Sequence, residues 1–126
     1  MSALARVISI EIGEDVFRAS LRDNPTADAL WAALPIECGF NTWGEEIYFD
    51  TGVSVDPEDT QATVELGDLG YWPPGRAMCL FYGATPASGP GEIRPASPVA
   101  VFGRLEGDPT ALKRVRGRRV RVSRAS

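Results

Sequence analysis

The 126-residue sequence contains no histidine, a single lysine and only two cysteines. Without imidazole groups there is no histidine general base, no Ser–His or Cys–His nucleophile pair and no zinc site built on histidine. The cysteines, Cys38 and Cys79, lie 41 positions apart in apolar runs, so the chain has no CxxC pair. We expect both to be small buried hydrophobic residues, and a disulfide between them is possible but not implied.

Long apolar runs are also missing from the sequence. No stretch approaches the roughly 20 apolar residues that a membrane-spanning helix needs. Residues 1–13 lack the basic start, the long apolar segment and the cleavage site of a signal peptide. The composition, 44% hydrophobic and 24% charged, is typical of a soluble globular protein. We therefore expect one domain over residues 1–126, located in the cytoplasm and without a membrane partner.

Acidic residues are missing from the end of the chain, where the charge is strongly basic. Residues 1–108 carry 17 acidic and 6 basic side chains, whereas residues 109–126 carry 7 basic side chains and no acidic one. Such a tail could form a patch for nucleic acid. However, Val120 and Val122 alternate with arginines, which is typical of a strand with one buried and one solvated face. We expect a final strand whose basic face offsets an acidic body, and no nucleic-acid partner.

Alternating apolar residues predict a hairpin at the start of the chain. Residues 4–12 form the first predicted strand and place Ile8, Ile10 and Ile12 on one face at a period of two residues. Residues 13–15 are turn-forming, and residues 16–22 repeat the alternating pattern. Two such runs joined by a short turn indicate two antiparallel strands.

Helix signals occur at two places. Asn24 or Thr26 can cap the first amides of a helix, Pro25 suits its first turn, and Pro35 ends it. A second, shorter helix is expected after Asp108, which also precedes a proline. Neither helix is long, so both need tertiary packing to persist. The first would most simply plug the open end of a sheet structure.

Extended segments separated by turns make up most of the remaining chain. They cover residues 36–43, 45–55, 62–72, 76–83 and 98–107. Residues 76–83 are apolar over nearly their whole length, which predicts a strand covered on both faces. Some eight strands with one or two capping helices predict an all-β fold, a closed antiparallel barrel, because closure removes exposed edges.

Candidate binding residues lie on the two extended segments on either side of Gly44. A period of two places Thr42, Glu46 and Tyr48 on one face and Trp43 on the opposite, core-facing side. The more polar face could be an ordinary solvated surface, or Glu46 and Tyr48 could form part of a groove for a polar ligand. The adjacent carboxylates Glu45 and Glu46 point to opposite faces of a strand, so they cannot act together as an acid–base pair.

The loop at 84–97 is rich in proline, glycine and serine. It lacks the Gly-Lys-Ser/Thr ending and the following helix of a phosphate-binding loop. Ser88 and Ser97 have no histidine partner, and a Ser–Lys pair with Lys113 is poorly supported. The loop is thus either a plain surface loop or the rim of a site, since long loops often carry function.

Metal chemistry has little support in the sequence. Asp56, Glu58 and Asp59 cluster in a loop, but the spacing lacks the glycine and closing glutamate of an EF-hand. We interpret the cluster as a solvated turn, and we expect neither a metal ion nor a cofactor.

Three motifs carry a family resemblance. They are "FNTWGEEIYF" at 40–49, "VELGDLGYWPPGRAMCLFYGATPAS" at 64–88 and "IRPASPVAVFGRL" at 93–105. In this order and spacing they resemble a small prokaryotic cyclophilin-like family of single-domain chains without an assigned function. The resemblance covers nearly the whole chain, and it implies a cyclophilin-type barrel with helices closing the ends.

The resemblance bears on catalysis as well. True peptidyl-prolyl isomerases of this fold rely on an arginine beside an apolar proline pocket that also holds tryptophan and histidine. The matching region here is "FNTW" at 40–43, and no arginine occurs between Arg22 and Arg76. Rotation about a peptide bond has a barrier of about 18–20 kcal/mol, and only Arg76 is near enough in sequence to replace the missing arginine. We expect no isomerase activity.

Three functions follow as hypotheses, because fold does not determine function. The first is a binding barrel for a small molecule or short peptide; the second is a divergent prolyl isomerase. The third is an interaction module, such as a homodimer, or an accessory subunit like the similar barrels of allophanate hydrolase and oxoprolinase. The candidate groove of the first hypothesis comprises Asn41, Glu46, Tyr48, Tyr71, Trp72, Ser88 and Ser97.

Overall fold

The computed structural model describes residues 6–125, so the first residues of the strand predicted from residue 4 lie outside the described part. The strands are β1 (Val7–Ile12), β2 (Asp15–Leu21), β3 (Ile36–Gly39), β4 (Asn41–Thr42), β5 (Glu46–Asp50), β6 (Asp68–Trp72), β7 (Ala77–Phe81), β8 (Ala100–Leu105) and β9 (Arg119–Arg124). One α-helix, α1 (Pro25–Ala33), and two 3₁₀-helices, η1 (Pro73–Gly75) and η2 (Pro109–Arg114), complete the elements of the described part.

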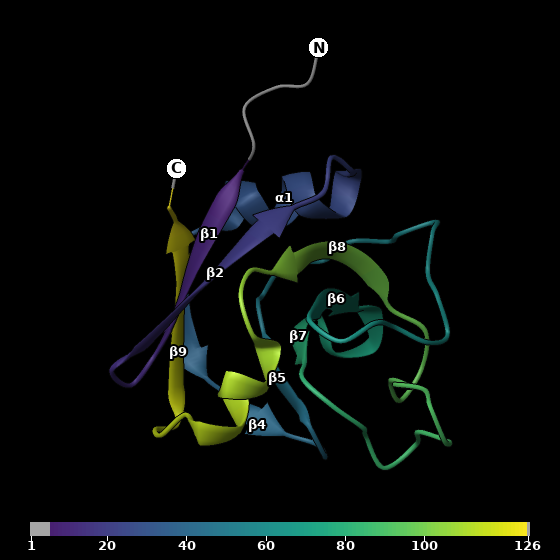
Figure 1. The fold of residues 1–126 in the computed structure, drawn as a ribbon. Helices are drawn as coiled ribbons and strands as arrows, with labels where there is room; N and C mark the ends of the chain where they lie inside the picture. The colour runs from purple at the N-terminus through teal and green to yellow at the C-terminus, as the bar shows by residue number, and fades with distance from the viewer. Residues whose placement is uncertain (1–5, 126) are drawn as a thin grey trace.

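All nine described strands form one antiparallel sheet that curls into a nearly closed barrel (Figure 1). Their order is β3-β9-β1-β2-β8-β6-β7-β5-β4. The end strands β3 and β4 are consecutive in the chain. Where the two ends of the sheet meet, the Cys38 thiol on β3 donates a hydrogen bond of 3.7 Å to the carbonyl of Asp50 on β5. The predicted barrel is confirmed, with one more strand than expected because segment 36–43 divides at Phe40, which hydrogen-bonds to Arg118.

Inward-facing side chains from opposite walls fill the barrel. Ile8, Ile10 and Ile12 are completely or almost completely buried, as their alternating spacing predicts. Helix α1 lies over one end of the barrel and adds Ala27 and Leu30 to the same core (Figure 1). Among the described residues, no helix is long and apolar enough to cross a membrane.

Asn24 fixes the start of α1, as the sequence predicts. Its side-chain oxygen accepts a hydrogen bond of 2.8 Å from the Ala27 amide, which caps the helix. Its side-chain nitrogen donates to the Val101 carbonyl at 3.2 Å, which ties the helix to β8. The short helix expected after Asp108 is also present, in 3₁₀ form, with Asp108 as its cap.

Strand β9 has the predicted two-faced character. Val120 and Val122 are buried, whereas Arg121 lies 3.5 Å from Glu37 on the neighbouring strand β3. Arg124 stacks over Trp31, with its guanidinium carbon 4.7 Å from the ring centroid. These arginines of the basic tail thus interact with the barrel's own side chains.

Residues 51–55 and 62–67 differ from the prediction, because they belong to a long loop at 51–67 rather than to two strands. Single bridges at Gln61–Val99 and Val64–Ile93 hold this loop against the loop before β8. Together the two loops cover the outer face of the sheet, where a second cluster of buried side chains lies. Its members are Val64, Ala77, Cys79, Phe81, Val99 and Val101.

This second cluster explains why β7 is buried on both faces, as its apolar sequence predicts. The loops lie so close to the sheet that Gly70 on β6 has no room for a side chain. A Cβ atom there would lie 2.9 Å from Cγ2 of Val99 and 3.1 Å from a ring carbon of Phe81. Glycine at this position therefore allows the covering loop to pack.

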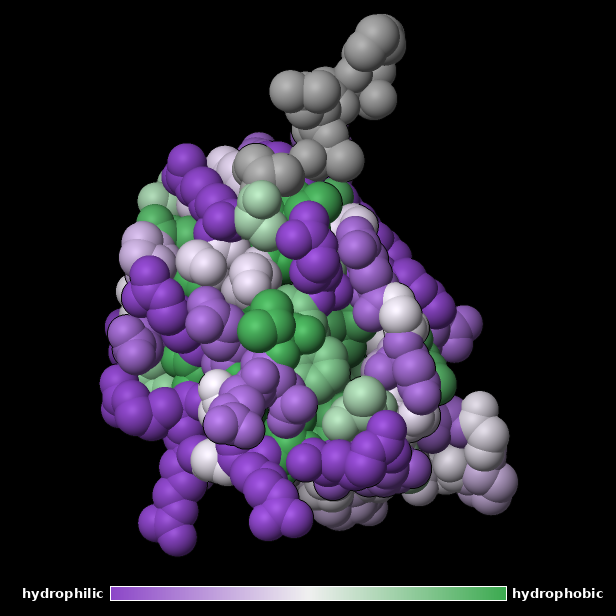
Figure 2. Space-filling model, turned by 60° about the vertical axis from the view of Figure 1, so that its left-hand side comes forward, coloured by the Kyte–Doolittle hydropathy of each residue, from purple (hydrophilic) through white to green (hydrophobic). Residues whose placement is uncertain are grey.

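The face turned forward in Figure 2 is largely hydrophilic, with a smaller apolar area at its centre. Val16, on the outer side of β2, is the most exposed large apolar residue of the described part, at 62%. Nothing in the structure indicates a partner for this surface. The homodimer stays a prediction, which sedimentation of the protein at high concentration would test.

Candidate functional site

The hairpin of β4 and β5 determines which side chains face outward at the edge of the sheet. Thr42 pairs with Ile47, and the Trp43 amide donates to the Glu46 carbonyl at 2.9 Å. Opposite residues of an antiparallel pair point to the same face, so Trp43 shares the outer face with Glu46. The predicted facing of Thr42 and Trp43 was wrong, because the period of two was counted across Gly44 and Glu45, where the chain reverses its direction.

The tip of this hairpin is fixed in place. Gly44 has a φ of +60°, which suits the first position of a two-residue hairpin loop. The Glu45 amide donates to the Ala84 carbonyl at 2.9 Å, and the Tyr82 amide donates to the Glu45 carbonyl at 3.0 Å. A Cβ atom on Gly44 would lie 2.9 Å from the Ala84 oxygen, so the tip packs tightly against the start of the 84–97 loop.

A hollow of about 150 Å³ lies on the outer face, beside this hairpin. It is lined by Trp43, Glu46, Tyr48 and Trp72. Tyr48 on β5 and Trp72 on β6 stand on either side of β7, and the outward residues of β7 at this level, Ala77 and Cys79, are small. Backbones two strands apart are separated by about 10 Å, so small residues on the middle strand leave space between two aromatic side chains. We call this hollow the aromatic groove.

Glu46 is the unusual residue of the aromatic groove. Its side chain is buried, with 6% of the residue exposed, and its Oε1 atom is buried without a hydrogen-bond partner. Burial raises the pKa of the carboxyl above its ordinary value, and the neighbouring Cys79 thiol opposes this shift. No cationic side chain of the described part contributes to the pKa of Glu46. Burial, and then the Glu46 charge, raise the pKa of the Cys79 thiol in turn.

Trp72 and Ser97, two members of the predicted set, lie together. The indole Nε1 of Trp72 donates a hydrogen bond of 2.6 Å to the Ser97 hydroxyl. Ser97 belongs to the loop that covers the outer face, so this bond holds the tryptophan ring at the side of the aromatic groove. Trp72 is only partly buried, which leaves part of its surface available to a ligand.

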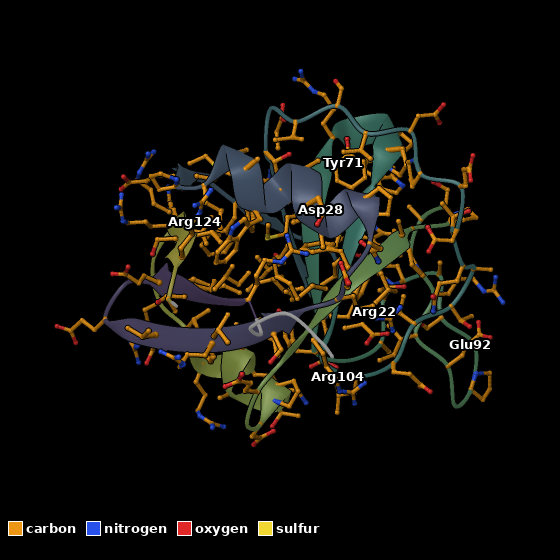
Figure 3. The ribbon with its side chains drawn as sticks, turned by 90° about the horizontal axis from the view of Figure 1, so that it is seen from above. Arg22, Asp28, Tyr71, Glu92, Arg104 and Arg124 are labelled. Carbon is orange, nitrogen blue, oxygen red and sulfur yellow. The ribbon has the colours of Figure 1, made fainter. Side chains whose placement is uncertain are left out.

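Asn41 and Ser88 lie at the margin of the site or away from it. Asn41 is exposed on the edge strand β4 and pairs with Tyr48, so it shares the outer face without lining the groove. The Ser88 hydroxyl accepts hydrogen bonds from the Thr85 amide at 2.9 Å and from the Arg94 amide at 3.0 Å. Ser88 therefore organises the 84–97 loop, whose outer part carries Glu92 (Figure 3).

Tyr71 does not belong to the groove, which corrects its place in the predicted set. The residue is completely buried inside the barrel. Its hydroxyl donates to the Val53 carbonyl at 2.5 Å and accepts from the Val55 amide at 3.1 Å. Figure 3 shows Tyr71 beside the loop that follows β5. Neighbouring strand residues face opposite sides, so when Trp72 faces outward Tyr71 must face the core.

Arg76 is engaged away from the aromatic groove. Its guanidinium forms an ion pair of 3.0 Å with Asp50, at the end of β5 opposite to Glu46. Its backbone adopts a left-handed conformation with φ of +49°, where the chain turns from η1 into β7. The four residues that line the groove include an acid and no base.

The acidic loop at Asp56, Glu58 and Asp59 is exposed and borders a larger hollow of about 510 Å³ near the start of α1. In the part of the chain that the structure describes, no group of three or more cysteine, aspartate or glutamate side chains converges where a metal ion could be held. This hollow also lacks a buried polar atom without a partner, since Glu46 Oε1 is the one such atom among the described side chains.

A family model described as cyclophilin-like matches residues 6–123 of the chain. The chain belongs to the cyclophilin-like family. A solution structure of a hypothetical protein from Archaeoglobus fulgidus is similar, with 39% sequence identity, a TM-score of 0.81 and coverage of 98% of each chain. A search of curated proteins finds no match for this cyclophilin-like protein.

These findings confirm the family and the barrel expected from the three sequence motifs. They add no activity, because the archaeal relative is itself described as hypothetical. What the aromatic groove of this cyclophilin-like protein does must therefore be argued from its own residues.

Proposed function

We propose that this cyclophilin-like protein binds a small molecule or a short peptide in the aromatic groove. The observation that carries the proposal is that Glu46 lines an open hollow, while its buried Oε1 atom has no hydrogen-bond partner. An unsatisfied buried polar atom costs about 1–3 kcal/mol. A ligand that donates a hydrogen bond to this oxygen would remove that cost on binding.

The surroundings of Glu46 support the same function. Binding sites for small molecules are mostly apolar and contain a few placed polar groups. The groove has this balance, with three aromatic side chains around one carboxyl. The hairpin tip and the Trp72–Ser97 hydrogen bond hold two of its walls before any ligand arrives, and a preformed site loses less entropy on binding.

A fragment titration followed by NMR tests the binding function. We expect fragments to shift the indole signals of Trp43 and Trp72, which line the groove, and to leave the signal of Trp31 unchanged. Trp31 serves as an internal reference because it lies under Arg6 and Arg124, outside the groove. If a broad library shifts neither groove tryptophan, or binds only at other places, the proposal is wrong.

The isomerase hypothesis leads to a different expectation. Arg76 is paired with Asp50, and a groove lined by an acid offers no positive charge to polarise a peptide carbonyl. We expect that micromolar protein does not accelerate isomerisation of a Xaa-Pro peptide in a protease-coupled assay. A rate that increases with protein concentration and is lost in Arg76→Ala would contradict this expectation.

A further inference from the structure

We propose that the aromatic groove binds a small alkylammonium cation that carries at least one N–H, with Glu46 as its hydrogen-bond acceptor and counter-ion. The inference rests on the proposed binding function and narrows the class of ligand. The cation could be a free amine or the end of an alkylated lysine side chain, since both present the same chemical group.

The first argument comes from the Glu46 carboxyl. A buried carboxylate is strongly disfavoured unless it is paired and hydrogen-bonded. The neighbouring acid Glu45 is paired in this way, because it is partly exposed and lies 3.2 Å from the Lys113 amine. Glu46 has no such partner, and its Oε1 accepts no hydrogen bond. An ammonium group would supply both the charge and the donor.

The second argument comes from the aromatic walls. Cations are attracted to the faces of tryptophan and tyrosine rings, and most strongly to tryptophan. Trp31 already has two guanidinium groups against it, at 5.8 and 4.7 Å from its ring centroid. In the described part, neither Trp43 nor Trp72 has a cation over its ring. A groove that combines these two tryptophans with Tyr48 and a carboxylate matches an alkylated ammonium in shape and charge.

The volume of the groove is sufficient for a small ligand group. At about 30 Å³ per water molecule in the liquid, a volume of about 150 Å³ holds roughly five non-hydrogen atoms. Trimethylammonium has four non-hydrogen atoms. Its three methyl carbons can contact the aromatic rings, and its nitrogen carries the N–H that donates the hydrogen bond. A divalent metal ion does not fit this donor set, because hard cations need six or more oxygen ligands and one carboxylate supplies at most two.

Three probes of similar size separate the roles of charge and hydrogen bond. Trimethylammonium has both a charge and an N–H, tetramethylammonium has only the charge, and tert-butanol has a donor without charge. We expect trimethylammonium to bind at least about tenfold more tightly than tert-butanol, and more tightly than tetramethylammonium. Each would be titrated into isotope-labelled protein, with the indole signals of Trp43 and Trp72 as reporters and Trp31 as the reference.

Two glutamates next to each other provide a matched pair of variants. Glu46→Gln keeps the shape of the side chain, and we expect it to weaken trimethylammonium binding at least about tenfold. Glu45→Gln makes the same chemical change one residue away, outside the groove lining, and should leave binding unchanged. A Glu46→Gln protein that still binds trimethylammonium as tightly as the parent would overturn the proposal.

The selectivity of the unaltered protein tests the proposal without any variant. If tert-butanol binds as tightly as trimethylammonium, the cation is excluded, while binding in the groove still stands. If none of the three probes shifts the groove signals, the cation proposal is wrong, and the fragment titration decides the binding function separately. A further titration with acetylated dimethyllysine amide distinguishes the sources: tighter binding than trimethylammonium indicates a peptide side chain, and weaker binding a free amine.

Discussion

Replacing Tyr71 with phenylalanine is expected to lower the free energy of unfolding by about 2 kcal/mol and to leave binding in the aromatic groove unchanged. The hydroxyl of Tyr71 is bonded to both the Val53 carbonyl and the Val55 amide. Phenylalanine would keep the ring in the core but remove the group that holds the loop after β5. Denaturant unfolding followed by tryptophan fluorescence measures the loss.

Tyr48→Phe is the matched control for this experiment. It also removes a tyrosine hydroxyl, but from the outer face of the sheet, where the Tyr48 hydroxyl makes no hydrogen bond within the described residues. We expect a change in unfolding free energy of less than about 0.5 kcal/mol. If Tyr48→Phe were the more destabilising of the two, the structural role assigned to Tyr71 would be contradicted.

Much of the fold could be predicted from the sequence because its signals are local. Strand β1 alternates isoleucines at a period of two, and β9 alternates valines with arginines, so the buried face of each strand follows from its residues. Capping is equally local, since Asn24 and Asp108 bond to amides two or three residues later. The full extent of the loop at 51–67 was missed because the valines near its two ends imitate strands, although they pack against the protein from a loop.

The site was harder to predict because it depends on pairing between segments. Period two counted along the chain placed Trp43 in the core, but a two-residue reversal turns it to the outer face opposite Glu46. The break at Gly44 was recognised, but its geometry as a two-residue hairpin, which resets the facing of the residues before it, was not. Tyr71 and Trp72 were grouped because both are aromatic, although adjacent strand residues must face opposite sides. Ser97 was placed in the candidate groove because it belongs to the 84–97 loop. Its hydrogen bond to Trp72 could not be predicted, since it depends on tertiary packing.

Replacing Glu46 with leucine is expected to raise the free energy of unfolding by about 1–3 kcal/mol near neutral pH. The carboxyl is buried against Cys79 and the aromatic residues of the groove, and one of its oxygens has no partner. An apolar side chain of similar size removes this unsatisfied group. The measurement is denaturant unfolding of both proteins over a series of pH values, with Glu45→Gln as a control at the adjacent position.

The pH dependence identifies the cause of this gain. Burial raises the pKa of Glu46 in the folded protein above its value in the unfolded chain. The contribution of Glu46 to the stability of the parent protein is therefore most favourable at low pH, where Glu46 is neutral in both states, and it is lost as pH rises through the folded-state pKa. The advantage of Glu46→Leu should be small at low pH and grow toward neutral pH. A constant difference across the series would mean that packing, and not the charge, is responsible.

Stability and binding should thus change in opposite directions at this one position. A residue that only builds the core stabilises the fold, so its replacement costs free energy, as expected for Tyr71. A residue shaped for a ligand can instead destabilise the free protein, because its polar group is satisfied only in the complex. The combination of a more stable protein and a lost cation site in Glu46 variants would therefore distinguish a binding carboxylate from a structural one. Neither the stability measurement nor the titration makes this distinction alone.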